Sequence, residues 1–163
     1  MNWKNNNLKA GEEALIKKIG LLIVDDEEEI VLSFTEILKK YFTVYSTSEV
    51  TEALQIFKEK RPKIIISDQR MPEIKGLDFL EEIKKTDPAT IRILISGFSD
   101  IEVLIKAVNN GLLYKYIEKP CDTKELINAT IEGAKYYIKN SGLTEQHKDI
   151  LELKEYEFEN YTW

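Results

Sequence analysis

The sequence predicts an α/β domain with a doubly wound, five-stranded parallel sheet and helices on both faces. Five short, nearly continuous apolar runs indicate buried strands, because they are brief and rich in β-branched residues. The stretches between them repeat apolar residues at helical spacing. Strands that alternate with helices are expected to run parallel, since parallel neighbours need a long connection that is usually a helix.

The elements follow one another in a regular order. The five strands are expected over residues 19–24, 42–45, 64–66, 91–95 and 113–117. The helical patterns that follow them cover residues 30–41, 50–57, 77–83, 101–108 and 127–138. Ser99 and Asp122 suit helix N-caps, and Gly111 suits the end of the fourth of these helices. A further short helix, AGEEALIKK, is expected ahead of the first strand.

These patterns divide the chain into three parts. We predict an N-terminal extension over residues 1–18, the α/β domain over residues 19–140, and a C-terminal tail or connector helix over residues 141–163. The tail holds many apolar and aromatic residues for a solvated segment, yet about 20 residues cannot form an output domain. It is expected to dock on the domain, to pair with a copy of itself, or to begin a connector helix.

Composition excludes several classes of protein. The chain has 163 residues, of which 43% are hydrophobic, and this is enough for one domain with a closed core. A net charge of −6 argues against direct binding of nucleic acid. The single cysteine, Cys121, excludes an internal disulfide. No apolar run reaches the roughly 18 residues of a membrane span, and the N-terminus lacks the apolar core of a signal peptide, so a cytoplasmic protein is expected.

Polar residues stand where four of the five strands end. The first strand is followed by Asp25 and Asp26, the third by Asp68, the fourth by Ser96 and the fifth by Lys119. Ligands of such sheets bind outside the carboxyl ends of the strands. Two carboxylates about 4 Å apart repel by roughly 4 kcal/mol at an effective dielectric constant of about 20. A single lysine cannot neutralise three of them, so a divalent cation is expected.

The ligand types decide which cation and which chemistry are expected. Oxygen ligands without His or Cys favour Mg²⁺ over Zn²⁺, with Mn²⁺ as the alternative. A carboxylate beside Mg²⁺, an ammonium and a hydroxyl can accommodate a phosphoryl group. Asp68 could then accept that group as an aspartyl phosphate.

Each of these residues also has a plainer explanation when it is taken alone. Asp26 suits a helix N-cap and Asp68 suits a turn before Pro72. Ser96 beside Gly97 suits a loop, and Lys119 suits a solvated surface. Independent turns and caps have no reason to gather at one edge of one sheet. Together, these groups therefore favour a functional site.

The motifs VDDEEE, ISDQRMP, LISG and YIEKP, in this order and spacing, resemble the receiver domain of two-component response regulators over residues 19–138. This resemblance implies a flavodoxin-like receiver fold with Asp68 as the phosphoacceptor. It implies that Asp26, Asp68 and the backbone carbonyl of Arg70 hold Mg²⁺, and that Asp25 acts through a metal-bound water. It also implies that Lys119 pairs with the phosphoryl group, ahead of a cis peptide bond.

The resemblance further implies a switch and a set of partners. Ser96 and Tyr116 would form the switch pair, and Arg70 and Phe98 would flank the phosphoryl group and slow its hydrolysis. The donor would be a histidine kinase or a histidine phosphotransfer protein. The response would appear on the face made by the helix over 101–108, the strand over 113–117 and the helix over 127–138. That face or the C-terminal tail would serve dimerisation or an effector.

Two details bear on the output. The DQRMP and LLYKYIEKP versions of the motifs resemble receivers attached to cyclic-dinucleotide enzymes, cyclases or histidine kinases. The stretch GLLYKYIEKP holds one residue more between Gly111 and Lys119 than is usual in the family. We therefore expect the response face to be reshaped where the fourth helix meets the fifth strand.

Two other classes compete with this interpretation. A Mg²⁺-dependent phosphohydrolase would also form a phosphoaspartate, but it typically carries a second acid two residues after the nucleophile, where this chain has Arg70. A scaffold that has lost phosphorylation would be expected to lack Asp26, Asp68 or Lys119. The sequence thus predicts a signalling domain and not an enzyme with an external substrate.

Overall fold

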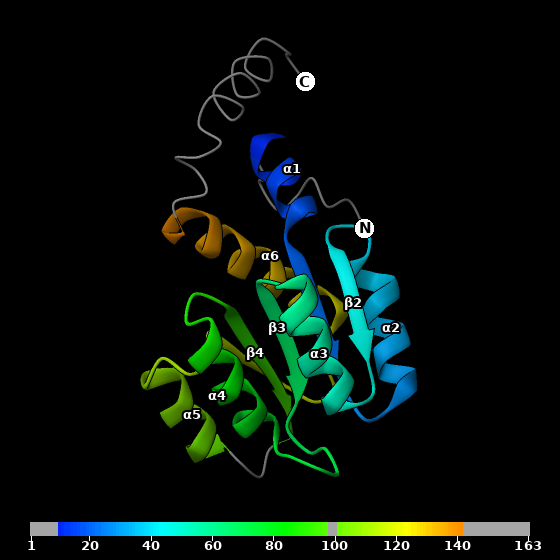
Figure 1. Ribbon diagram of the computed structural model, residues 1–163, viewed down its shortest axis with the longest axis vertical. Helices are drawn as coiled ribbons and strands as arrows, with labels where there is room; N and C mark the ends of the chain where they lie inside the picture. Colours follow the sequence, from blue (N-terminus) through cyan, green and yellow to red (C-terminus); the bar gives the residue numbers. More distant parts are fainter. Residues whose placement is uncertain (1–9, 98–100, 142–163) are drawn as a thin grey trace.

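A single five-stranded parallel sheet forms the centre of the molecule, with strand order β2-β1-β3-β4-β5. The computed structural model describes residues 10–97 and 101–141 (Figure 1). The strands are β1 (Gly20–Val24), β2 (Thr43–Thr47), β3 (Ile64–Asp68), β4 (Ile91–Ser96) and β5 (Lys115–Glu118). The helices are α1 (Ala10–Lys18), α2 (Glu28–Leu38), α3 (Val50–Lys60), α4 (Gly76–Thr86), α5 (Ile101–Asn109) and α6 (Thr123–Asn140). The predicted doubly wound α/β fold is confirmed.

Helices cover both faces of this sheet, and each face has its own hydrophobic core. Side chains alternate along a strand, so Leu21 and Ile23 enter one core while Leu22 and Val24 enter the other. The first core is closed by α1, α2 and α6, and the second by α3, α4 and α5. Figure 1 shows α3 and α4 in front of the sheet and α6 behind it. The central strands are therefore buried on both sides, as their apolar composition requires.

The short helix α1 packs on the domain. Leu15 and Ile16 are buried in the same core as α6 residues such as Tyr137 and Ile138. This packing continues the core across the predicted boundary at residue 18, and the division of the chain into extension, domain and tail stays a prediction. The predicted tail lies outside the described residues from residue 142 onward.

Two strands extend further toward the carboxyl edge of the sheet than the apolar runs indicated. β3 includes Asp68 and β4 includes Ser96, so both polar residues are held by the sheet and not by loops. β5 begins at Lys115, two residues later than predicted, because residues 110–114 form a turn after α5. Gly111 has φ +75 in this turn, a conformation that favours glycine and ends the helix as expected.

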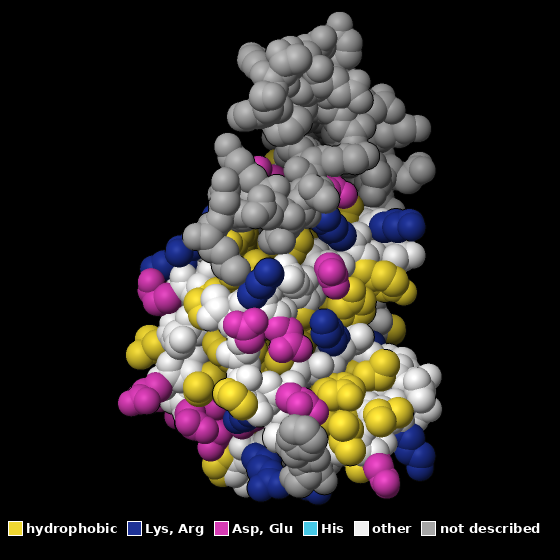
Figure 2. All heavy atoms as spheres, turned by 180° about the vertical axis from the view of Figure 1, so that it is seen from behind, with side chains coloured by type: hydrophobic (Ala, Val, Ile, Leu, Met, Phe, Trp, Pro, Cys, Tyr) yellow, Lys and Arg dark blue, Asp and Glu magenta, His cyan; other side chains and the backbone are white. Residues whose placement is uncertain are grey.

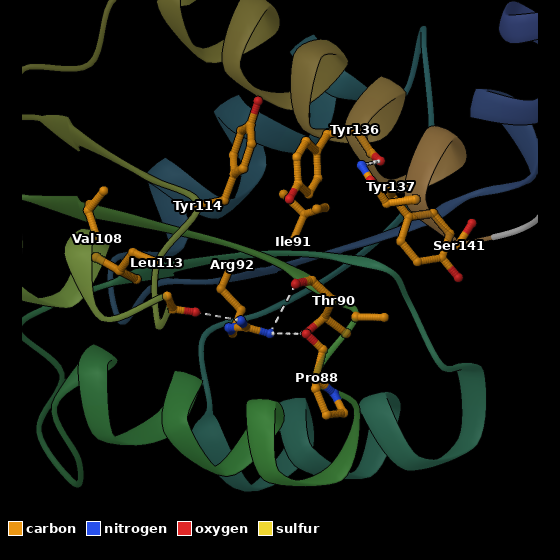
Figure 3. A pocket seen from close by; sticks show the side chains of 13 residues that line it. Pro88, Thr90, Ile91, Arg92, Val108, Leu113, Tyr114, Tyr136, Tyr137 and Ser141 are labelled. Atoms are coloured by element: carbon orange, nitrogen blue, oxygen red, sulfur yellow. Dashed lines mark hydrogen bonds between the residues drawn. The ribbon is translucent and has the colours of Figure 1, made fainter.

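Arg92, near the amino end of β4, holds this turn in place at the same edge of the sheet. Its side chain is 5% exposed, and its Nε donates to the carbonyl of Leu112 at 2.6 Å. Its Nη2 donates to the carbonyl of Gly111 at 3.1 Å, and its Nη1 donates to the carbonyl and hydroxyl of Thr90 at 3.0 and 2.8 Å. Figure 3 shows Arg92 at one side of a cavity of about 480 Å³ that reaches α6. A buried guanidinium therefore holds the turn before β5.

The described residues can also be compared with what a membrane-spanning helix or a nucleic-acid-binding surface would need. Within residues 10–97 and 101–141, no helix has the length and apolar composition needed to cross a membrane. Figure 2 shows acidic and basic side chains interspersed with apolar ones over the described part of the rear face. That part of the surface carries no broad basic area, which agrees with the acidic composition.

Candidate functional site: the acidic carboxyl edge of the sheet

Three aspartates converge at the carboxyl edge of the sheet. Asp25 and Asp26 follow β1 directly, and Asp68 is the last residue of β3, the neighbour of β1. One carboxylate oxygen from each lies within 4.8 Å of the others. Asp25 and Asp68 are buried, with 2% and 4% exposed, whereas Asp26 is exposed. The sheet register thus brings together the acids that the sequence predicted.

Burial penalises the charged form of Asp25. Burial raises the pKa of Asp25 from its ordinary value of 3.8 to about 6. The backbone N–H of Glu27 opposes the effect by donating to Asp25 Oδ1 at 2.9 Å, while the negative charge of Asp68 adds to it. A buried carboxyl group with a pKa near 6 benefits from a cation at neutral pH.

Lys119 supplies one cation to the site. Its Nζ lies 2.8 Å from Asp68 Oδ1, and its backbone N–H donates to the carbonyl of Ser96 at 2.9 Å. Partial burial lowers the pKa of Lys119, but the hydrogen bond and charge of Asp68 and the charge of Asp25 outweigh it, so the net pKa is raised. Lys119 is therefore charged and paired with Asp68. The peptide bond from Lys119 to Pro120 is cis, as the family resemblance implied.

The two residues of the predicted switch pair lie on adjacent strands. Ser96 is buried at the end of β4, one position beyond Ile95, which is the register partner of Asp68. Its Oγ donates to the carbonyl of Gly97 at 3.3 Å. Tyr116 in β5 is half-buried and pairs with Leu94 in the register. The alternation of side chains places Ser96 and Tyr116 on the same face of the sheet.

The two predicted tuning residues differ in what the structure shows. Arg70 is exposed and forms an antiparallel bridge with Lys75 across the loop that follows β3. Phe98 lies outside the described residues. The roles of Arg70 and Phe98 in hydrolysis stay predictions.

Sequence reasoning missed two residues that support the site. Gln69 is 6% exposed, and its side-chain Oε1 accepts a hydrogen bond from the N–H of Leu77 at 2.9 Å. A Cβ atom at Gly76 would collide with the backbone carbonyl of Asp68 and lie 2.8 Å from Leu94 Cδ1. Gly76 is the first residue of its helix, and a glycine there can indicate that another backbone segment approaches closely. No comparable signal marked Gln69.

The donor set fits a hard divalent cation. All three converging groups are carboxylates. Among the described residues, they form a group of three acidic side chains that could hold a metal ion. Oxygen ligands on a rigid edge suit Mg²⁺, and two buried acids with one paired lysine leave negative charge for it to balance.

The chain is similar in sequence to known proteins. The family model described as the response regulator receiver domain matches residues 21–131. The hydrogenase transcriptional regulatory protein HoxA of Cupriavidus necator is 34% identical over 139 residues, which are 85% of this chain and 28% of HoxA. A response regulator of Rickettsia bellii described as NtrX-like is 40% identical over 112 residues, 67% of this chain and 23% of that protein.

A solved structure has a similar fold. The response regulator receiver domain protein from Clostridium thermocellum is 31% identical, with a TM-score of 0.68, and the match covers 74% of this chain and 97% of that one. This chain spans about a quarter of the length of the two curated relatives, so the match concerns their receiver part. The chain belongs to the response regulator receiver domain family.

Proposed function

We propose that this chain is a phosphorylation-controlled signalling domain that accepts a phosphoryl group on Asp68 in a Mg²⁺-dependent reaction. The donor is a histidine kinase or a histidine phosphotransfer protein. The observation that carries the proposal is the convergence of Asp25, Asp26 and Asp68 within 4.8 Å, with Lys119 Nζ 2.8 Å from Asp68. Membership of the receiver family supports it.

The transfer is a simple displacement at phosphorus. A carboxylate oxygen of Asp68 forms the new P–O bond as the bond from phosphorus to the donor's imidazole nitrogen breaks, and that nitrogen keeps the electron pair. Lys119 then neutralises the phosphoryl oxygens, and the Ser96 hydroxyl donates to one of them. Asp26, Asp68 and the Arg70 carbonyl would hold Mg²⁺, with Asp25 acting through a water, and the ion would neutralise charge on the transferred group.

Phosphorylation is expected to change the face formed by α5, β5 and α6. Movement of Ser96 toward the phosphoryl group leaves space behind it, into which the Tyr116 ring rotates. The helices of this face expose apolar side chains: Val103 and Ile105 on α5 are about half exposed, as is Tyr136 on α6. Such side chains suit contact with an effector, an output domain or a second copy of the chain.

Arg70 is proposed to slow loss of the phosphoryl group. It follows Asp68 by two residues, at the position where phosphohydrolases of similar chemistry carry a general acid or base. An exposed guanidinium there cannot activate water by taking its proton, and its bulk obstructs approach to the site. Phe98 is proposed to act in the same way.

The kind of output stays a prediction. The names of the two curated relatives describe a transcriptional regulator and a response regulator, whereas the sequence motifs resemble receivers linked to cyclic dinucleotides or kinases. A family name does not fix what a receiver controls. We propose that the chain controls an effector or attached output domain that is related to cyclic dinucleotides or to kinases.

Acetyl phosphate provides the direct test. Incubation of the chain with acetyl phosphate and Mg²⁺ should give one phosphoryl adduct by intact mass spectrometry, and Asp68→Asn should abolish it. Asp78→Asn, at an exposed position in α4, is the matched control and should react like the parent. In the same assay, Arg70→Ala should shorten the half-life of the adduct severalfold.

Two outcomes would contradict the proposal. A parent chain that gives no adduct in the presence of Mg²⁺ would indicate a scaffold. Rapid and sustained release of phosphate from simple phosphate esters would indicate a phosphohydrolase.

A further inference from the structure

Gln69, the residue after the phosphoacceptor, connects three elements of the fold. Its backbone N–H donates to the carbonyl of Ile95 in β4 at 3.1 Å, which continues the pairing of β3 with β4. Its backbone carbonyl accepts from the N–H of Gly76 at 2.9 Å, and its side-chain Oε1 accepts from the N–H of Leu77 at 2.9 Å. One buried residue thus binds the end of β3 to the start of α4.

These contacts also replace a missing helix cap. The first N–H groups of a helix lack partners within the helix and are usually satisfied by the side chain of the N-cap residue. The N-cap residue of α4, Lys75, makes no side-chain cap hydrogen bond. Gln69 satisfies the first two N–H groups of α4 from outside the helix, through its main chain and its side chain.

The loop over residues 70–75 is closed at its base by this arrangement. The loop begins directly after Gln69 and ends at Gly76, whose N–H is bound to the Gln69 carbonyl. Arg70 and Lys75 pair across it in an antiparallel bridge. The position of the Arg70 backbone therefore depends on the hydrogen bonds that Gln69 makes.

The start of α4 is also in direct contact with the phosphoacceptor. Gly76 approaches the Asp68 backbone so closely that a Cβ atom would collide with the Asp68 carbonyl. Loss of the side-chain hydrogen bond of Gln69 would loosen the start of α4 and, with it, the loop and this contact. The Asp68 carboxylate and the Arg70 carbonyl would then both be held less firmly.

We propose that Gln69 is a positioning residue of the phosphorylation site, which holds the loop over residues 70–75 in the geometry that binds Mg²⁺. The inference rests on the proposed function, because it assigns the Arg70 carbonyl to the metal. Groups that orient metal ligands from behind commonly affect affinity for the metal by an order of magnitude.

Two substitutions separate positioning from bulk. Gln69→Leu keeps the size of the side chain but removes the acceptor, and Gln69→Glu keeps an acceptor oxygen. Gln55→Leu, at an exposed position in α3, is the matched control. Mg²⁺ binding is measured by isothermal titration calorimetry, and protection of the Leu77 amide by hydrogen exchange.

We expect Gln69→Leu to weaken Mg²⁺ binding about three- to tenfold, the effect of one lost hydrogen bond. Protection of the Leu77 amide should fall by a similar factor. Gln69→Glu should keep that protection and bind Mg²⁺ at least as tightly as the parent, and Gln55→Leu should match the parent. Gln69→Met provides a second apolar variant in case leucine disturbs packing.

The results distinguish three cases. Lower amide protection with unchanged Mg²⁺ affinity in both apolar variants would show that Gln69 only caps α4, and would overturn the inference. Unchanged amide protection would overturn it as well. In the third case, the apolar variants bind Mg²⁺ more weakly than the parent, but the parent forms no adduct with acetyl phosphate. This result would contradict the proposed function and leave the positioning role in place.

Discussion

The two edges of the sheet handle charge in opposite ways. At the carboxyl edge, the buried carboxylates of Asp25 and Asp68 face each other, the exposed Asp26 and one lysine. At the amino edge, the buried guanidinium of Arg92 is surrounded by carbonyl and hydroxyl oxygens from two loops. Burial lowers the pKa of Arg92 while the charge of Asp87 opposes the effect, so both edges hold buried ionisable groups.

The difference lies in whether the partners are fixed dipoles or like charges. Each nitrogen of the Arg92 guanidinium donates to a carbonyl or hydroxyl oxygen, and these hydrogen bonds join β4 to the turn before β5. The aspartates repel one another and gain from an added cation. A buried charge that is surrounded by dipoles therefore indicates a structural role. Buried charges of like sign that lie close together indicate a binding site for an ion of opposite charge.

The largest effect is expected from breaking the amino edge. Arg92→Met should lower the free energy of unfolding by about 3–5 kcal/mol, because it leaves the carbonyls of Gly111, Leu112 and Thr90 without their donor. The formation of the acetyl phosphate adduct should persist, since Arg92 lies at the far edge from Asp68. Urea unfolding gives the first quantity and mass spectrometry the second.

A control for this substitution is available on α3. Lys58→Met removes a positive charge at an exposed position and should leave the urea midpoint unchanged. A stability loss below about 1 kcal/mol for Arg92→Met, or loss of the adduct in a folded variant, would contradict the assignment of Arg92 to structure alone.

Much of the fold followed from the apolar pattern. The alternation of apolar runs with helical spacing predicted the parallel sheet, and the sheet in turn predicted which residues share an edge. The pattern could not give the strand ends at Asp68 and Ser96, because a polar residue that continues a strand breaks the apolar run. It also missed the start of β5, because the Arg92 contacts are tertiary.

The sequence predicted which residues form the site but not how deeply each of them is buried. The family resemblance gave Asp25 and Asp26 different roles, but the sequence did not predict that the structure buries Asp25 and exposes Asp26. Only the direction of each side chain separates them. Gln69 was missed for a related reason, since its role depends on Gly76 and Leu77, seven and eight residues away.

The second effect concerns the carboxyl edge without metal. The pKa of Asp25 is about 6 in the folded chain and near 3.8 when exposed, so folding is favoured by its protonation. This contribution is fully present below about pH 4 and is lost as the pH rises through about 6. Asp25→Asn should therefore stabilise the Mg²⁺-free chain at pH 7.5 by about 1–3 kcal/mol and much less at pH 4.5, with one pKa unit equal to about 1.4 kcal/mol.

Urea unfolding at the two pH values, with a chelator present, measures this difference between variant and parent. Added Mg²⁺ should reverse the order at pH 7.5, because it stabilises the parent more than the variant. Equal stability of parent and Asp25→Asn at both pH values would show that the carboxyl edge carries no unbalanced charge, and the contrast between the edges would fail.

The smallest effect is expected at a partly buried ion pair of the amino edge. Lys63 Nζ lies 2.7 Å from Asp87 Oδ2, and both side chains are less than a third exposed. Lys63→Met should lower the free energy of unfolding by about 0.5–1 kcal/mol, with a smaller loss in 1 M salt. The exposed pair of Lys85 and Glu82 is the control, and Lys85→Met should change the urea midpoint little. A loss for Lys63→Met as large as that for Arg92→Met would mean that ion pairing, and not solvation by carbonyl oxygens, holds the amino edge together.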